Sequence, residues 1–527
     1  MITGKNYIGN HLSAEGKETF KTFNPQLNIE TEHTFFEASE DEIRLAVNLA
    51  WEAFQKFKEV SGAKKANFLR EIAHQIENLG DELVKTYCQE SGLPEGRAKG
   101  ERNRTCFQLR TFSDLVEEGS WVNATIDTAI PDRKPQPKSD LRKMSIPLGP
   151  VAVFGASNFP LAYSTAGGDT ASALAAGCPV VVKSHPMHAG TGELVTSAII
   201  TAAKKTAMPN GVFSNLNSSG IEVGQQLVKH TKIKAVGFTG SIRGGRALFD
   251  LASQRREPIP VFAEMGSINP VVLLPKALKK KGTVWAKTYA SSITLGTGQF
   301  CTNPGLLLAL DGDGLDGFIQ TLSEEILKIA PSSMLHPNIH TKYHEHKRMM
   351  FDQGGLSVTA NYEAAVAENY AQQTVVSVSG SDFLKNSKLH QEVFGPFSMV
   401  VKSKDVDELA NIITQLEGQL TGTIISEESE IESYDNVVNA LQGRVGRLIF
   451  NGVPTGVEVC PAMQHGGPYP ASTDSRFGAV GIHAIQRWVR PVSFQDWPNT
   501  LLPDELKDEN PLNISRLVNG AQTKECL

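Results

Sequence analysis

One cysteine stands in a sequence setting that suits attack on a carbonyl carbon. Cys301 lies within Gly298–Gly305, where flanking glycines let the backbone come close to a substrate. A thiolate is intrinsically nucleophilic even at the small fraction present near neutral pH. Most lone cysteines are inert core residues, so the segment alone fits either role.

Two further polar residues could complete such a site. Glu264 follows the apolar run 260–263, so we expect it at a strand end, where open parallel sheets place their sites. There it could act as a general base toward water; a surface glutamate is the alternative. Asn158 follows the apolar run 151–154 and could donate a hydrogen bond to an oxyanion, or simply cap a helix or turn.

The elements that must position these residues alternate between short apolar runs and helical stretches. The runs are Val151–Phe154, Val180–Val182, Val212–Leu216, Ile233–Phe238, Pro260–Ala263, Asn269–Leu274, Leu306–Leu310 and Phe397–Val401. This alternation predicts an α/β fold with parallel, doubly wound sheets, and a second α/β domain after about Glu264. Ahead of them, Ser39 and Glu42 form a capping-box pattern that predicts the start of an amphipathic helix.

Bulk properties narrow the class of protein. A chain of 527 residues should form at least two domains, and a net charge of −6 without a long basic run argues against nucleic acid as a partner. The first residues lack a secretory signal pattern, and the longest uncharged run, 148–168, is broken by glycines and prolines. We therefore expect a cytoplasmic protein without a membrane partner. Six widely spaced cysteines favour reduced thiols over disulfides or a structural metal site.

Taken in order, six segments resemble the motifs of the aldehyde dehydrogenase superfamily. They are Asn158–Pro160, Val180–Lys183, Gly237–Ser241, Glu264–Gly266, Gly298–Cys301 and Glu392–Pro396. The segment His465–Thr473, together with Phe159–Ser164 and Arg104–Thr105, is similar to one branch. That branch contains α-ketoglutaric semialdehyde dehydrogenases and a bacterial fatty aldehyde dehydrogenase.

The resemblance implies an aldehyde dehydrogenase-like fold with a Rossmann-type cofactor domain, an α/β catalytic domain and a small oligomerisation element. We expect the NAD(P)-binding domain in residues 1–118 and 144–263, and the catalytic domain in 264–450. Residues 119–143 and 485–527 would bridge subunits of a homodimer or homotetramer, or form surface loops.

The resemblance also implies the chemistry. Cys301 would attack the aldehyde to form a thiohemiacetal, with Asn158 and the Cys301 backbone N–H stabilising the oxyanion. Hydride loss would leave a thioester, hydrolysed to the acid by water that Glu264 activates, which argues against a CoA-acylating enzyme. The expected reaction converts α-ketoglutaric semialdehyde (2,5-dioxopentanoate) to 2-oxoglutarate. The alternatives are NADP-dependent oxidation of medium or long aliphatic aldehydes and a catalytically silent binding protein.

For the cofactor, NAD or NADP, the resemblance places Ser241 and the helix after it at the pyrophosphate, and Lys183 and Glu392 at the two riboses. The full predicted set is Phe154, Ser157, Lys183, Ser184, Pro186, Gly240, Ser241, Gly245, Glu392 and Phe394. NAD-preferring members commonly carry a glutamate where this chain has Pro186. Without that acid, a 2′-phosphate is not repelled, so we expect NADP to be preferred.

The predicted substrate residues are Arg104, Gln108, Phe159 and Cys460. Arg104 and Gln108 lie one turn apart on a probable helical stretch, where they could meet a distal carboxylate or carbonyl. A salt bridge of Arg104 is the alternative. Ser157 replaces the family's usual tryptophan, so the pocket should differ from that of generic members.

Two other patterns are set aside. Gly312–Gly317 matches a dinucleotide fingerprint, but its aspartates would repel a pyrophosphate. The histidines between His336 and His346 fit a solvated helix face better than a metal site, and we predict no bound metal.

Overall fold

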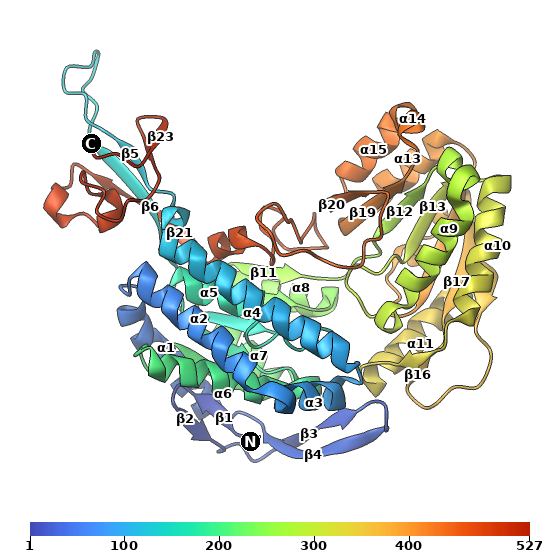
Figure 1. Ribbon diagram of the computed structural model, residues 1–527, viewed down its shortest axis with the longest axis horizontal. Helices are drawn as coiled ribbons and strands as arrows, with labels where there is room; N and C mark the ends of the chain where they lie inside the picture. The colour runs from blue at the N-terminus through green and yellow to red at the C-terminus, as the bar shows by residue number, and fades with distance from the viewer.

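The first group of apolar runs forms one sheet in the computed structural model, which describes all 527 residues (Figure 1). Its strands, in spatial order, are β11 (Val261–Glu264), β10 (Ala235–Thr239), β7 (Val151–Phe154), β8 (Val180–Lys183), β9 (Phe213–Leu216), β1 (Asn6–Ile8) and β2 (His11–Ser13). The five strands from β11 to β9 are parallel, and β1 and β2 add an antiparallel edge. The predicted runs are thus strands, with ends that differ by one or two residues.

Helices cover both faces of this sheet. They are α1 (Glu40–Phe57), α2 (Gly62–Asn78), α3 (Gly80–Ser91), α4 (Glu95–Glu118), α5 (Gly168–Ala176), α6 (Ala189–Lys205), α7 (Glu222–Lys229) and α8 (Ile242–Ser253). Val151 and Val153 of β7 pack in the core of α2 to α6, whereas Ala152 packs in the core of α1, α7 and α8. Alternate residues therefore face opposite helix layers, as a doubly wound sheet requires. The capping box of α1 is confirmed by hydrogen bonds between Ser39 and Glu42 in both directions.

The later runs form a second sheet of seven strands. Its order is β15 (Ser357–Asn361), β17 (Thr374–Ser379), β18 (Phe397–Ser403), β13 (Leu306–Leu310), β12 (Pro270–Leu273), β19 (Gln419–Ile425) and β20 (Val445–Phe450). Its helices are α9 (Pro275–Thr294), α10 (Asp313–Lys328), α11 (Pro337–Phe351), α12 (Gly380–Lys385), α13 (Val406–Gln415), α14 (Glu428–Ile431) and α15 (Asp435–Gln442). Only β15 is antiparallel. α9 and α10 pack on one face of the sheet, and α11, α12, α13 and α15 on the other.

A third sheet forms an arm that projects from the first lobe at the upper left of Figure 1. Its strands are β21 (Val489–Gln495), β6 (Leu141–Pro147), β5 (Thr125–Asp127), β22 (Arg516–Val518) and β23 (Ala521–Thr523). The segments 119–143 and 485–527, which we expect to bridge subunits or to form surface loops, therefore contribute strands to this sheet. β6 continues to Pro147, across the boundary predicted at residues 143 and 144, because its register with β21 extends to that residue.

One hairpin, β3 (Thr19–Asn24) with β4 (Ile29–Phe36), and one short antiparallel pair, β14 (Ser332–Ser333) with β16 (Tyr370–Ala371), complete the strands. No helix combines the length and the hydrophobicity that crossing a membrane demands. Between the two lobes, the chain from β20 to the arm runs back along the end of β11 (Figure 1). This return segment brings residues of the C-terminal part to the edge of the first sheet.

Candidate active site

The loop that carries Cys301 is held in one conformation by close backbone contacts. It follows a short 3₁₀ turn, Leu295–Gly298, in which Thr297 and Gly298 have φ angles of 59° and 66°. A Cβ at Gly298 would lie 2.2 Å from the Gly395 carbonyl oxygen, so only glycine fits there. On the other side, the Asn269 amide donates to the Cys301 carbonyl at 2.9 Å. The sulfur is thus presented by a rigid turn, within 4.8 Å of ligand atoms of Glu264 and His465.

Glu264 is the last residue of β11 and is 5 % exposed. Its backbone pairs with Ser472 in an isolated antiparallel bridge, and the next residue, Met265, donates its N–H to the Ala471 carbonyl at 2.8 Å. Glu264 therefore sits at the carboxyl edge of the first sheet, as its position after an apolar run predicts.

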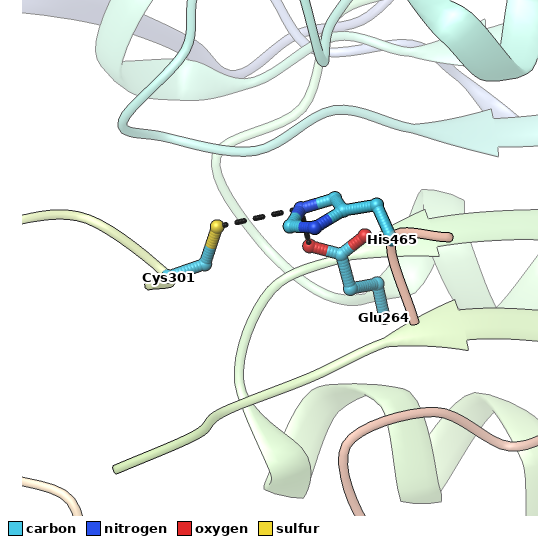
Figure 2. Close-up of side chains that lie close together, drawn as sticks. All are labelled: Glu264, Cys301 and His465. Atoms are coloured by element: carbon cyan, nitrogen blue, oxygen red, sulfur yellow. Dashed lines mark hydrogen bonds and ion pairs between the residues drawn. The ribbon is translucent and has the colours of Figure 1, made fainter. Parts of the chain in front are cut away.

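His465 joins these two residues, and the sequence patterns assigned it no role. Its Nε2 lies 3.7 Å from the Cys301 sulfur and 3.0 Å from Glu264 Oε1 (Figure 2). The contact with Glu264 has the distance of an ion pair but not the alignment of a hydrogen bond, since both Glu264 oxygens lack a hydrogen-bond partner. The side chain is 1 % exposed, so imidazole, thiol and carboxylate meet in a largely dry environment.

The segment His465–Thr473 places this imidazole by contacting both lobes. Toward the first lobe, the Thr473 N–H donates to the Ala263 carbonyl at 3.0 Å; toward the second, Gly418 donates to the Tyr469 carbonyl at 3.1 Å. A Cβ at Gly446 would lie 1.8 Å from the Gly466 oxygen, so the segment also presses directly on β20. His465 is consequently held between a residue of each domain.

Burial raises the pKa of the Cys301 thiol well above its usual value, and the nearby negative charge of Glu264 raises it further. Arg104 acts in the opposite direction but does not offset burial. The resting side chain is therefore a neutral thiol at pH 7, and it needs a proton acceptor to become a nucleophile. The imidazole of His465 is in position to accept that proton.

Asn158 reaches the same loop from the end of β7. Its Nδ2 donates to the Gln299 carbonyl at 3.0 Å, two residues before Cys301, and its side chain is 9 % exposed. An amide nitrogen carries two hydrogens, so one N–H is still able to point at an oxyanion. The structure thus brings Asn158, Glu264 and Cys301 to one place.

An aromatic wall lies beside the sulfur. The Phe159 ring meets Tyr163 at 5.2 Å and Phe300 at 5.6 Å, both edge to face, and these residues share an apolar cluster with Val459. Arg97, on α4, places its guanidinium 4.4 Å from the Phe159 ring and 4.7 Å from the Phe300 ring. Phe159 is therefore at the predicted substrate side.

The remaining predicted substrate residues differ in placement. Arg104 donates to the Tyr163 hydroxyl at 3.0 Å, its Nε is buried without a partner, and it forms no ion pair, so the salt-bridge alternative is wrong. Gln108 points elsewhere: its amide nitrogen is buried near the Gly168 backbone at the start of α5. Cys460 is partly exposed, next to Val459 of the apolar cluster.

The predicted adenosine-side residues follow β7 and β8. Lys183 ends β8 and donates its Nζ to the Ser218 carbonyl at 2.7 Å, and burial lowers its pKa to about 8. The Ser184 hydroxyl is buried without a partner, and Pro186 opens a short 3₁₀ turn before α6. Phe154 and Ser157 flank the same edge, with the Phe154 ring 6.3 Å from that of Phe238.

The residues predicted for the pyrophosphate side lie at the start of α8. Ser241 is its N-cap and accepts from the Gly244 N–H at 3.1 Å, after Gly240. A Cβ at Gly245 would lie 2.6 Å from the Met265 sulfur, so this helix packs unusually close to the strand end.

The residues predicted for the nicotinamide side, Glu392 and Phe394, lie on a loop that shares a pocket with Gly298 and Phe300. Burial raises the Glu392 pKa to about 7, and its carboxylate packs on Gly266. A helix N-terminus, a buried lysine, an unpartnered serine hydroxyl and this carboxylate are the groups that a dinucleotide's phosphates and riboses need. The residues therefore fit a nicotinamide dinucleotide.

The sequence patterns missed His465, Tyr163 and Arg97. His465 stands in a segment whose resemblance indicates a branch of the family but no role for the histidine, and the Gly-Gly pair after it was the one available signal of a close backbone approach. Tyr163 lies in the segment Phe159–Ser164 and Arg97 lies on α4, but the contacts that bring Tyr163 to His465 and Arg97 to Phe300 join residues far apart in sequence.

The fold and this site are typical of a dehydrogenase, and the chain belongs to the aldehyde dehydrogenase family, whose family model matches residues 11–490. It is 45% identical over 522 residues to an α-ketoglutaric semialdehyde dehydrogenase of Acinetobacter baylyi, with 99% of each chain covered. A second enzyme of that name, from Azospirillum brasilense, is 45% identical over 521 residues, again with 99% of each covered.

Among solved structures, betaine aldehyde dehydrogenase of Staphylococcus aureus in complex with NAD⁺ has the same fold. The TM-score is 0.81 at 19% identity, and the match covers 94% of this chain and 96% of that one. The α/β fold and the activity class, an NAD(P)-dependent aldehyde dehydrogenase, are confirmed by these matches.

Proposed function

We propose that this enzyme oxidises α-ketoglutaric semialdehyde to 2-oxoglutarate. Two observations support the substrate: full-length similarity to two enzymes of that name, and the arginine Arg104, whose positive charge acts on the Cys301 thiol. The substrate carries a carboxylate at the end opposite its aldehyde. Arg104 has a buried, unpartnered Nε that such a carboxylate could satisfy.

In the first step, the Cys301 thiol loses its proton to His465 Nε2, and the sulfur attacks the aldehyde carbon. The second N–H of Asn158 and the backbone N–H of Cys301 stabilise the oxyanion of the thiohemiacetal. When bound, the nicotinamide dinucleotide supplies the hydride acceptor that oxidation requires. Lys183, Ser241 and Glu392 would hold it.

In the last step, Glu264 accepts a proton from the water that attacks the thioester carbon. Its two buried oxygens have no hydrogen-bond donor in the protein, so they are available to orient that water. The bond between the acyl carbon and sulfur then breaks and the acid leaves. The sulfur takes back the proton that His465 accepted in the first step, and Glu264 releases its proton to solvent.

The substrate assignment is tested with two aldehydes of equal length, α-ketoglutaric semialdehyde and pentanal. Replacing Arg104 with methionine removes the charge but retains much of the apolar stem. We expect kcat/KM for the semialdehyde to fall by about 10- to 100-fold, the loss of a charged hydrogen bond, and little change for pentanal. Arg110→Met, on the same helix but paired with Glu77 at the surface, is the matched control. Equal losses for both aldehydes would contradict the assignment.

The aromatic wall of Phe159, Tyr163 and Phe300 favours a second candidate, aliphatic aldehydes. A wild-type enzyme that saturates only with long aliphatic aldehydes, and not with the semialdehyde, would decide for that candidate.

We propose further that NADP is preferred over NAD. Pro186 places no carboxylate near the adenosine ribose. The acid whose negative charge acts on Lys183 is Glu37, and its carboxylate already accepts a hydrogen bond from the Ser219 N–H at 2.6 Å. Comparing kcat/KM with both cofactors tests this. Pro186→Glu should reverse the preference by about tenfold or more through repulsion of the 2′-phosphate. A wild type that prefers NAD strongly would refute it.

We propose that the arm mediates the formation of a homodimer or homotetramer. It exposes large apolar side chains away from both lobes, and such a patch marks an interaction surface. These residues are Ile130, Leu141, Trp497, Leu501 and Leu512. Size-exclusion chromatography with light scattering tests the proposal: a monomer at micromolar concentration would contradict it.

A further inference from the structure

Three side chains of the types that bind transition metals converge in the cleft: the thiol of Cys301, the imidazole of His465 and the carboxylate of Glu264 (Figure 2). One potential ligand atom from each lies within 4.8 Å of the other two. They come from distant parts of the chain, so no spacing in the sequence indicates a metal site.

Two of the three groups are buried with unsatisfied polar atoms. Glu264 is 5 % exposed and neither of its carboxylate oxygens has a hydrogen-bond partner, and His465 is 1 % exposed with an unpartnered Nδ1. A buried carboxylate without donors is costly unless a cation or a water compensates it. The site therefore favours a bound cation as well as the hydrolytic water.

The separations suit a tetrahedral ion. Zinc bonds of 2.0–2.3 Å place neighbouring ligand atoms roughly 3.3–3.6 Å apart. The sulfur to Nε2 distance is 3.7 Å, the Nε2 to Oε1 distance is 3.0 Å, and all three ligand atoms lie within 4.8 Å of one another, so side-chain shifts of about 1 Å suffice. Three protein ligands leave the fourth position open to water.

We propose that Zn²⁺ binds at Cys301, His465 and Glu264 and reversibly inhibits the enzyme. A thiolate and an imidazole select zinc over Mg²⁺ or Ca²⁺, which prefer oxygen ligands alone. Binding forms a zinc–sulfur bond and releases the thiol proton to solvent, with no change of oxidation state. The metal binds the sulfur lone pair that otherwise attacks the aldehyde. It also binds the Glu264 carboxylate that otherwise activates water, so metal binding and catalysis exclude each other. The inference concerns the resting protein and does not depend on which aldehyde is the substrate.

The site is tested by metal binding to the full-length, metal-free protein without cofactor or substrate. Calorimetry with Zn²⁺ should show one site per chain, and Co²⁺ should produce a thiolate-to-cobalt charge-transfer band with the visible bands of a tetrahedral ion. Cys301→Ser should abolish the charge-transfer band. His465→Gln and Glu264→Gln should weaken binding by at least roughly the 10- to 100-fold that follows loss of an outer-shell partner. Cys88→Ser and His483→Gln, which alter a thiol and an imidazole outside the cleft, should leave binding unchanged.

A second measurement needs no variant. Zn²⁺, but not Mg²⁺, should slow alkylation of Cys301 by iodoacetamide, followed by mass spectrometry of its peptide, and should inhibit turnover until EDTA is added. Absence of binding, unchanged binding in Cys301→Ser, or loss of binding in either control variant would overturn the proposal. Because these readouts involve no aldehyde, failure of the substrate assignment would leave them unaffected.

Discussion

The two walls of the catalytic cleft are built in different ways. The cofactor wall is formed by strand ends and a helix start: Lys183 ends β8 and Ser241 caps α8. The substrate wall is formed by side chains from a helix and irregular segments, with Arg97 stacked on Phe159 and His465 supplied by a return segment. The first wall follows from sheet topology, whereas the second depends on contacts between residues far apart in sequence.

From this difference we expect that a substitution in one wall impairs the function of that wall and leaves the function of the other unchanged. Cys301→Ser should have the largest effect, a loss of turnover on the order of 10⁴-fold or more, because it replaces the nucleophile. Cofactor binding, followed by fluorescence, should stay within about twofold of wild type, since no side-chain hydrogen bond links Cys301 to the cofactor wall. Loss of cofactor affinity to the same extent as activity would show that the walls are coupled.

Asn158→Ala should come next, with kcat reduced by roughly 10²- to 10³-fold, as for loss of one oxyanion donor. The amide also fixes the cysteine loop through the Gln299 carbonyl, so the thermal midpoint needs to be measured in parallel. An unchanged kcat with a lowered midpoint would assign Asn158 a structural role only.

Replacing His465 distinguishes a role of this side chain as proton acceptor from a role in packing. His465→Gln should lower kcat/KM at pH 7 by about 100-fold, within the range of general base catalysis, because burial keeps the Cys301 thiol protonated. Since the raised pKa of that thiol puts its ionisation at alkaline pH, activity of the variant should recover as pH rises. A pH profile parallel to that of wild type would contradict this role.

The same difference between the two walls decides which parts of the site can be predicted from the sequence. Strand positions such as Val151–Phe154 and the strand-end site of Glu264 follow from local patterns, because periodicity and parallel-sheet geometry are local or topological rules. His465 could not be assigned, because its role depends on antiparallel contact between Ser472 and Glu264, which no local pattern specifies. The contacts of Gln108 could not be predicted for the same reason: sharing a helix face with Arg104 does not decide what each side chain meets.

The smallest expected effect is a pH dependence of cofactor affinity. Burial raises the pKa of Glu392 to about 7, so the carboxylate becomes protonated as pH falls below 7 and loses an acceptor for ribose hydroxyls. Cofactor affinity should therefore fall several-fold between pH 8 and pH 6, the order of one hydrogen bond. Glu392→Gln should show weaker binding with no such dependence; an identical slope in both proteins would exclude Glu392.

The convergence of Cys301, Glu264 and Asn158 on one carbonyl is tested most directly by trapping the acyl-enzyme. In Glu264→Gln, the thiol still attacks the aldehyde but water is no longer activated. Mixing this variant with semialdehyde and NADP should give a burst of one reduced cofactor per chain and an acyl adduct on the Cys301 peptide, seen by mass spectrometry. Continuous turnover at the wild-type rate, or an adduct on another residue, would contradict the account.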